Sequence, residues 1–462
     1  MPRLTSPLLL TATLVALAAC GDRPTEPARA PIAPPAAPAL ATVPGAISPA
    51  LIRQLAASRG IVPLTKPQPV RPALVQLGQA LLFDPILSGN RDISCSTCHL
   101  PGFATGDGRS LSIGQGATGM GPGRLHPTGA FIPRNAPPLF NLASMRHLFW
   151  DGRVEVDAQG RVHTPAGAQI TPAMERVFEF GAASALGMFP VTSRAEMRGG
   201  SGNEVAAIDD ADNPAIWAAL MRRLGAIPEY RAMFEAAYPG TRFDDMTFAH
   251  ASNAIGGFLV DRLTFNDSPW DRFLAGSNDA LTARQREGAQ TFLTLKCSIC
   301  HNGATFSDDD FHGVAVAQIG PGEGNGDLHV DDFGRWNVTR ARADKYRFRT
   351  TPLRNVELTA PYGHDGSILT LKGFVEHYSE SDLKLRAFDA SPLEAALRPT
   401  LLPTTEAILA QRDTLLNGVV LTDALVENLM VYMRALTDDR ARDLSALVPA
   451  RVPSGLPVDG RR

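Results

Sequence analysis

Two copies of the pattern Cys-x-x-Cys-His constrain this chain more than any other feature of its sequence. The first copy, CSTCH, occupies residues 95–99, and the second, CSICH, occupies residues 297–301. This pattern is the attachment signature of a c-type haem, in which both thiols bond covalently to the porphyrin and the adjoining imidazole binds the iron from one side. The sequence therefore predicts two covalently bound c-type haems, attached through Cys95, Cys98, Cys297 and Cys300 and ligated by His99 and His301.

Other uses of the paired cysteines are a Cys₄ zinc site shared by the two pairs and two redox-active Cys-x-x-Cys pairs. Neither alternative accounts for the histidine that directly follows each second cysteine. The chain has five cysteines, and the two motifs use all of them except Cys20 near the N-terminus. We therefore interpret both motifs as haem sites.

The first twenty residues have the build of an export signal. One arginine precedes an apolar stretch at residues 8–17, which is too short to span a membrane as a helix, and small residues lead to Cys20. The sequence LAAC at residues 17–20 resembles the lipobox of bacterial lipoproteins, which implies cleavage before Cys20 and a lipid anchor on its thiol. The alternative is a plain secretory signal with an incidental cysteine. We expect a lipid-anchored periplasmic protein, with the outer membrane favoured by Gly21.

The charge of the chain excludes one class of partner. The formal net charge is −3 over 462 residues, so there is no overall basic field and nucleic acid is not an expected partner. No stretch after the signal is long and apolar enough to cross a bilayer, so we expect membrane contact through the lipid anchor only. The oligomeric state is open, and a homodimer is compatible with the sequence.

Helical periodicity predominates along the chain. A helix is predicted from Pro72 to just before Asp84, and a capping box of Thr282 and Gln285 begins a second helix that leads into the second motif. Residues 425–436 also place apolar side chains on one helical face. Because strand signals are few, the predicted fold class is mainly α, with two c-type cytochrome-like haem domains and little strand.

Composition and motif positions divide the chain into five parts. Residues 1–20 are the predicted signal peptide, and residues 21–70 are a tether whose proline- and alanine-rich start cannot bury enough surface to fold. The predicted haem domains cover residues 71–270 and 271–450, and residues 451–462 form an irregular tail.

Seven segments of the chain follow one another in an order shared with a known family. They are LGQALLFDPILSGNRDISCSTCH, RNAPPLFNL, FWDGRV, SPWDRFLAG, KCSICHNG, LRNVELTAPYGHDGS and LTDALVENLMVYMRALTD, between about Leu77 and Thr437. Together they resemble the bacterial di-haem cytochrome c peroxidases and their methylamine-utilisation relatives of the MauG type. The resemblance implies an N-terminal, peroxidatic haem domain and a C-terminal, electron-transfer haem domain.

The resemblance also bears on the face of the first haem opposite His99. In the peroxidases the motif IGHG supplies a histidine that blocks the iron until it is displaced, whereas here SIGQG places Gln115 at that position. An amide is a poor ligand of haem iron, so we expect a first haem that is open without prior reduction. The alternative is that His126 or His147 caps the iron. Leu186 stands where many relatives have a distal glutamine, which removes one hydrogen-bond donor from the peroxide site.

Two residues match the catalytic positions of the family. Glu196 in AEMRGG matches the distal-pocket glutamate, whose carboxyl can move a proton from one oxygen of peroxide to the other. The alternative is a surface carboxylate beside Arg194 and Arg198. Trp150 in FWDGR matches the tryptophan between the haems, which can pass electrons or can simply be a packed aromatic side chain.

For the second haem, the helical pattern of LKGFVEHY predicts that Tyr378 points inward. The matching position is a methionine ligand in the peroxidases and a tyrosine in the MauG type, so Tyr378 is the predicted sixth ligand. A phenolate ligand would lower the reduction potential relative to methionine. The alternatives are a core tyrosine with His377, His364 or a nearby methionine on the iron.

The family also places a calcium ion between the domains, and Asn135, Thr359 and Pro361 match its ligand positions. We therefore expect one calcium ion beside the two haems. The activity that the resemblance implies is the reduction of hydrogen peroxide with electrons from a small cytochrome c or cupredoxin. A MauG-like oxidase of a protein or organic substrate, and a di-haem electron-transfer cytochrome without turnover, are the alternatives.

Overall fold

The computed structural model describes residues 48–127 and 130–460. The predicted signal peptide, Cys20 and the first part of the predicted tether lie outside these described residues. Within the described part, no helix has both the length and the apolar character needed to cross a membrane. Most regular structure is helical, as predicted, and the described strands form a three-stranded antiparallel sheet and a two-stranded one.

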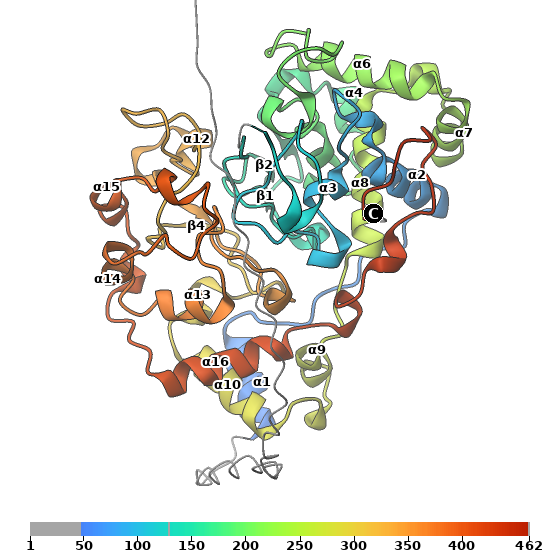
Figure 1. Ribbon diagram of the computed structural model, residues 1–462. Coiled ribbons are helices and arrows are strands. Elements are labelled where there is room, and N and C mark those ends of the chain that lie inside the picture. The colour runs from blue at the N-terminus through green and yellow to red at the C-terminus, as the bar shows by residue number, and fades with distance from the viewer. Residues whose placement is uncertain (1–47, 128–129, 461–462) are drawn as a thin grey trace, which may run out of the picture. The chain divides into compact units, whose positions relative to one another are not determined.

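The first half of the fold is built around α8, whose side chains are buried along nearly its whole length. Helix α8 packs against α2 and α5, and α2 in turn packs against α7 (Figure 1). Two glycines allow the close approach: a Cβ at Gly78 would lie 1.9 Å from the carbonyl oxygen of Ala254, and one at Gly256 would lie 2.6 Å from that of Ala183. The helices of this half are α2 (Pro72–Phe83), α3 (Cys95–Cys98), α4 (Pro172–Glu175), α5 (Ala182–Ala185), α6 (Asn213–Gly225), α7 (Pro228–Ala237) and α8 (Phe248–Arg262).

The second half is built around the pair of α10 and α16, which pack closely against each other. A Cβ at Gly288 would lie 2.3 Å from the carbonyl oxygen of Asn428, so only glycine fits where the two backbones meet. Around this pair, Trp270, Phe292, Phe306 and Tyr432 form an aromatic core. The helices of this half are α1 (Pro49–Ser58), α9 (Pro269–Leu274), α10 (Ala283–Thr294), α11 (Cys297–Cys300), α12 (Trp336–Thr339), α13 (Leu371–His377), α14 (Ser381–Arg386), α15 (Thr405–Leu409) and α16 (Asp423–Ala435).

The five strands in the described part of the chain are short, and all pair antiparallel. Strands β1 (His147–Leu148), β2 (Val154–Val156) and β3 (Val162–His163) form one sheet in sequence order. Strands β4 (Phe311–His312) and β5 (Phe348–Arg349) form the other, with Phe311 opposite Arg349. Each sheet follows one haem-attachment motif along the chain and pairs only two or three residues per strand. Neither sheet forms a layer of the fold.

Both ends of the described chain pack against the half that is distant in sequence. Helix α1 falls within the stretch predicted as a tether, yet Ile52 and Ala56 are fully buried in the core of the second half. The C-terminal segment is irregular and has no long helix. Its side chains Leu444, Val452 and Val458 are nevertheless buried in the core of the first half. Figure 1 shows α1 beside α10 and α16, and the last described residues of the C-terminal segment pack in the same core as α2 and α8. The tether prediction is therefore wrong for residues 49–58, because one apolar helical face is enough to dock them.

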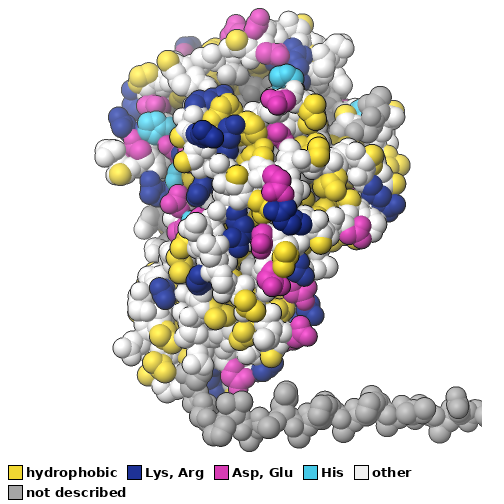
Figure 2. Space-filling view, turned by 90° about the vertical axis from the view of Figure 1, so that its left-hand side faces the viewer, with side chains coloured by type: hydrophobic (Ala, Val, Ile, Leu, Met, Phe, Trp, Pro, Cys, Tyr) yellow, Lys and Arg dark blue, Asp and Glu magenta, His cyan; other side chains and the backbone are white. Residues whose placement is uncertain are grey.

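Charged side chains do not gather by sign on the surface that Figure 2 shows. Basic, acidic and apolar side chains are intermixed over this face. Most of the ion pairs among the described residues involve at least one exposed partner, and such pairs contribute little to stability. On this face, the mixture of signs gives no continuous basic patch.

Candidate functional site

The first Cys-x-x-Cys-His motif folds as a single helical turn, α3, with His99 directly after it. Ser94 and Thr97 form a capping box that fixes the start of the turn. The Nδ1 atom of His99 lies 2.8 Å from the carbonyl oxygen of Thr105, so Nδ1 donates to the backbone and Nε2 is the nitrogen directed outward. Burial lowers the pKa of His99, which keeps the imidazole neutral and therefore able to bind iron.

The second motif has the same local geometry. Its two cysteines lie at the ends of α11, and the Nδ1 atom of His301 lies 3.0 Å from the carbonyl oxygen of Phe306. Burial also lowers the pKa of His301. Two unrelated stretches of sequence thus place two thiols and one outward imidazole nitrogen in the same arrangement, which fits covalent haem attachment at both sites.

The state of the thiols argues against the two rival uses of the cysteines. All four described cysteines are free, and burial raises the pKa of Cys95 to about 12 and that of Cys297 to about 11, whereas a redox-active pair needs a lowered thiol pKa. Among the described residues, the one group of three potential metal ligands joins Cys300 to Asp308 and His312 and includes no other cysteine. A shared Cys₄ zinc site is therefore not formed.

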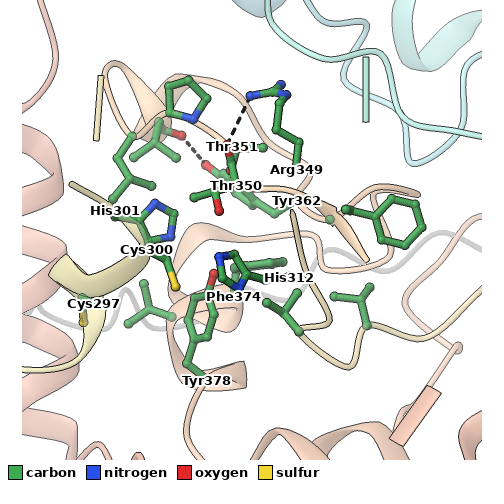
Figure 3. A pocket seen from close by; sticks show the side chains of 18 of the residues that line it. Cys297, Cys300, His301, His312, Arg349, Thr350, Thr351, Tyr362, Phe374 and Tyr378 are labelled. Atoms are coloured by element: carbon green, nitrogen blue, oxygen red, sulfur yellow. Dashed lines mark hydrogen bonds between the residues drawn. The ribbon is translucent and has the colours of Figure 1, made fainter. Parts of the chain in front are cut away.

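A large, mainly apolar cavity of about 420 Å³ opens beside the second motif. Cys297, Cys300 and His301 lie on its wall, and Figure 3 shows their side chains facing this space. The size is in the range of cofactor sites. The fit extends to charge, because Arg349 is a buried guanidinium on the wall that donates to the backbone oxygens of Phe149 and Thr350 and forms no ion pair with any described residue. Burial lowers its pKa to about 10. The propionate groups of a haem would supply the missing negative charge.

Tyr378 lies on the wall of the same cavity, as the sequence predicted. Figure 3 shows its phenol pointing from the end of α13 into the space beside Cys300 and His312. Burial raises the pKa of the phenol. Of the two alternative histidines, His377 is held by a 2.8 Å contact between Nε2 and the carbonyl oxygen of Val314, whereas His364 also lines the cavity and stacks on Phe348 at 3.8 Å between ring centroids.

Trp150 and the three residues predicted to bind calcium line the wall of this cavity too. The indole Nε1 of Trp150 donates to the backbone oxygen of Asn135 at 2.8 Å, which fixes the ring plane. The side-chain nitrogen of Asn135 donates to the carbonyl oxygen of Arg109 at 2.8 Å, so its amide oxygen is the end that a cation could use. The structure thus brings Asn135, Trp150, Thr359 and Pro361 together around the second haem site.

Glu196 lies close to the first motif, in the π-helical turn η7 (Arg194–Arg198). Its negative charge acts on both Cys95 and Cys98, where it contributes to the raised pKa values of the thiols. Burial is the main cause of a raised pKa of Glu196 itself. Arg194 and Arg198 both pair with Asp210 instead, so the alternative of a surface carboxylate held between these arginines is wrong.

Gln115 is engaged by a neighbouring carboxylate. Its side-chain nitrogen donates to Oδ1 of Asp92 at 3.0 Å, and its backbone nitrogen donates to the carbonyl oxygen of Glu196 at 3.1 Å. Leu186, at the position of the family's distal glutamine, packs against the core of the first half. These contacts hold residue 115 against the turn of Glu196.

The two histidines considered as caps of the first haem have other contacts. The ring nitrogens of His147 lie 3.2 Å from a carboxylate oxygen of Glu155 and 3.5 Å from one of Asp309. His126 is partly exposed, and its Nδ1 atom accepts a long hydrogen bond of 3.5 Å from the backbone of Ala130.

Sequence reasoning missed three polar residues around the two sites. His312 is held at the mouth of the second cavity between Asp308, at 3.0 Å, and Asp413, at 2.7 Å, and the bond to Asp308 is the main reason why its pKa rises to about 11. Asp92 binds the loop of Gln115, and Arg349 faces the second cavity. Asp308 is a near neighbour of His312 in the sequence, but Asp413, like the partner of Asp92, lies far away along the chain, so the local sequence does not mark these contacts.

Two matched haem-attachment turns, one beside a partly buried carboxyl and one beside a large apolar cavity, define a di-haem protein of the c-type cytochrome class. A family model described as di-haem cytochrome c peroxidase matches residues 72–279. The chain belongs to this di-haem cytochrome c peroxidase family, whose members in the comparisons include both peroxidases and MauG. The predicted family is therefore confirmed.

Similar proteins come from several bacteria. Cytochrome c551 peroxidase of Pseudomonas aeruginosa is 29% identical over 311 residues, covering 67% of this chain and 72% of that protein. Methylamine utilization protein MauG of Methylorubrum extorquens is 29% identical over 341 residues, covering 73% and 78%. Cytochrome c peroxidase Ccp of Escherichia coli is 31% identical over 317 residues, covering 68% and 55%.

Solved structures agree on the fold. A MauG-like protein associated with microbial copper homeostasis has a TM-score of 0.57 and 26% identity, covering 83% of this chain and 95% of that one. The diheme peroxidase BthA of Burkholderia thailandensis has a TM-score of 0.55 and 21% identity, covering 81% and 88%. The mainly helical two-haem fold predicted from the sequence is confirmed.

Proposed function

We propose that the chain reduces hydrogen peroxide to water at the site of the first motif, with electrons that arrive through the second haem from a small cytochrome c or cupredoxin. The observation that carries this proposal is Glu196: a partly buried carboxyl next to the first haem-attachment turn, with no ion pair among the described residues. An acid–base group at a peroxide site needs this combination of a dry environment and an unpaired carboxyl.

The two haems, when bound, supply iron that accepts electrons and delivers them to peroxide. The role of Glu196 is to take the proton from one oxygen of peroxide and return it to the other, which then leaves as water. Burial suits the residue to this task, because it raises the pKa of the carboxyl and so makes its carboxylate form a better proton acceptor. Leu186 adds no hydrogen bond, so Glu196 acts without the distal amide of many relatives.

Electron supply is assigned to the second site. Trp150 lines the second cavity, and Arg153, three residues later, is close enough to Glu196 to act on its pKa, so this short segment connects the surroundings of the two sites. We assign Tyr378 as the second protein ligand of the haem on His301. A calcium ion held by Asn135, Thr359 and Pro361 would stabilise the segments that carry this path.

A lipid anchor on Cys20 and a proline- and alanine-rich tether would hold the enzyme at a periplasmic membrane surface. Export is consistent with c-type haem attachment, which takes place outside the bacterial cytoplasm. The tether would leave the haem domains free to meet a diffusing electron donor.

The second candidate is a MauG-like oxidase, which uses the same sites to oxidise a protein or an organic substrate. Tyr378 favours it, because a phenolate ligand lowers the potential of the second haem and stabilises oxidised states. Both candidates need an open first haem, which Gln115 supports through its bond to Asp92.

One experiment separates these functions. The ferric protein is examined by absorption and electron paramagnetic resonance spectroscopy and then mixed with peroxide and reduced cytochrome c. A high-spin haem and steady oxidation of the donor are expected for the peroxidase. A long-lived oxidised state without donor consumption would favour the MauG-like oxidase. Two low-spin haems and no reaction would leave only an electron carrier.

A further inference from the structure

The turn that carries Glu196 packs closely against two other segments. On one side lies the loop of residues 113–116, and on the other lies the segment 89–92, which directly precedes the first haem-attachment turn. Glycines make both contacts close: a Cβ at Gly114 would lie 1.8 Å from the carbonyl oxygen of Ala195, and one at Gly89 would lie 1.9 Å from that of Arg198. Backbone hydrogen bonds also join these segments to the turn. The backbone nitrogen of Gln115 donates to the carbonyl oxygen of Glu196 at 3.1 Å, and that of Gly89 donates to the carbonyl oxygen of Met197 at 2.7 Å.

One carboxylate ties these two segments to each other. Oδ1 of Asp92 accepts a hydrogen bond of 3.0 Å from the Gln115 side chain, and Oδ2 accepts one of 3.1 Å from the backbone nitrogen of Gly116. Asp92 is itself anchored, because its backbone nitrogen donates to the Ser88 hydroxyl at 3.1 Å. Both carboxylate oxygens of Asp92 therefore bind the loop, and Asp92 itself lies three residues before Cys95.

The Gln115 amide fills the remaining space. Its Oε1 atom would lie 2.1 Å from a Cβ at Gly199, the residue that ends the turn of Glu196. Arg124 supports the loop from its other face, since its guanidinium donates to the carbonyl oxygens of Ile113 at 2.7 Å and Gly114 at 2.6 Å. The loop therefore has little freedom to move without displacing the turn.

We infer that Asp92 is a positioning residue for Glu196: its hydrogen bonds to Gln115 and Gly116 hold the loop of residues 113–116 against the turn that carries the acid–base carboxyl. These two hydrogen bonds are called the clasp. This inference rests on the proposed role of Glu196. In this arrangement Gln115 has a positive role as the donor that completes the clasp, in addition to the absence of an iron-binding imidazole. Misplacement of a catalytic group by about 1 Å can cost up to ~100-fold in rate, so even a partial release of the clasp should be measurable.

The test uses the full-length protein with both haems and compares Asp92→Ala, Gln115→Met and the double variant. Two quantities are measured: the rate constant for the reaction of peroxide with the ferric protein, and amide hydrogen exchange at residues 194–199. Each single variant is expected to lose about tenfold in rate, below the ~100-fold expected from loss of the acid–base group itself, and to exchange faster at these amides. The double variant is expected to match the single ones, because both remove the same contact.

Asp279→Ala is the matched control, because Asp279 is an exposed carboxylate in the short helix at Asn278–Ala280. It should retain the wild-type rate and exchange. In a Glu196→Gln background, Asp92→Ala should cause no further loss of rate, which shows that Asp92 acts through Glu196. If Asp92→Ala does not fold, Gln115→Met and Asp92→Asn carry the same comparison.

Wild-type exchange at residues 194–199 in both single variants would overturn the inference, and so would rate losses that multiply in the double variant. A wild-type rate for Glu196→Gln would instead remove the proposed acid–base role. The exchange data would still decide whether Asp92 holds the turn, so the two failures are distinguishable.

Discussion

The two haem-attachment turns are nearly identical in local structure and differ in what surrounds them. Each is one helical turn followed by a histidine whose Nδ1 atom contacts a backbone carbonyl. The first turn is enclosed by polar contacts: Thr97 is fully buried and bonds to Asp459 of the C-terminal segment, and Glu196 lies nearby. The second turn opens onto an apolar cavity, and Ile299, which corresponds to Thr97, is 37% exposed.

The motif therefore fixes only how a haem is attached. What the iron can do depends on residues that arrive from other parts of the chain. The carboxyl of Glu196 lies near the first turn, whereas an apolar wall that includes Tyr378 lies beside the second. The comparison can be tested by changing equivalent positions at the two sites.

The largest effect is expected from removing the thiols of one motif at a time. Cys95→Ala with Cys98→Ala should halve the covalently bound haem and abolish the reaction of the ferric protein with peroxide. Cys297→Ala with Cys300→Ala should also halve the haem, but it should spare that first reaction and abolish oxidation of the donor. Haem staining of the denatured protein and stopped-flow spectroscopy measure both quantities. Equal loss of peroxide reactivity in both variants would contradict the division of roles.

The next largest effect is expected from Glu196→Gln. The amide cannot take up the peroxide proton, so the rate constant of the ferric protein should fall by about 10²–10⁴, the usual contribution of a general acid–base group. The haem content and the spectrum of the second haem should not change. Glu175→Gln, at an exposed position in α4, is a suitable control.

The pH dependence of the same rate follows from the raised pKa of Glu196, for which burial is the main cause. The carboxylate form accepts the proton, so the rate should fall as the pH is lowered through this pKa. Because the pKa is raised, the fall should begin at a higher pH than for an exposed glutamate. In Glu196→Gln this acidic limb should be absent, and its persistence would assign the limb to another group.

A smaller effect, confined to the second site, is expected from Tyr378→Met. Replacing a phenolate by a thioether should raise the reduction potential of the second haem by about 0.1 V or more, because axial ligands set haem potentials over roughly 0.8 V. Peroxide reactivity of the ferric first haem should stay within about twofold, since the two sites are separate. Spectroelectrochemical titration measures the potential. A shift in His364→Ala rather than in Tyr378→Met would make His364 the ligand.

The smallest effect concerns the middle of the two motifs. Thr97→Val removes the buried hydroxyl that donates to Asp459 and accepts from the backbone nitrogen of Ser94, and leaving this buried nitrogen unpaired should cost about 1–3 kcal/mol of unfolding free energy. The equivalent change Ile299→Thr lies at the surface and should stay within about 0.5 kcal/mol. Denaturant titration of the two holoproteins makes the comparison. Similar costs at both positions would show that the surroundings of the turns do not differ in stability.

Much of the helical structure could be predicted because its signals are local. The helix from Pro72 ends at Phe83 as expected, and the capping box of Thr282 and Gln285 begins α10. Helix α1 was missed, since its ten residues follow a long proline- and alanine-rich stretch and become stable only by docking on α10. The strands were missed because two or three residues show no alternation.

The candidate site shows the same division between local and distant information. The cysteines and histidines of the motifs could be located because their spacing is itself the signature of covalent haem attachment. Glu196, Trp150 and Tyr378 needed the family resemblance, and they remain predictions of role whose positions near the two turns support them. Asp92 and His312 could not be found, because hydrogen bonds to Gln115 and Asp413 leave no trace in the sequence around them.

Each end of the described chain packs into the half of the fold that is distant in sequence, and this limits how the molecule can be divided or inherited. Since α1 completes the second core and the last buried residues complete the first, no uninterrupted run of codons encodes either half in full. A recombination event that carried one half into another gene would leave behind part of its interior. The pair of haem sites is therefore expected to be transmitted, lost and refolded as one indivisible unit.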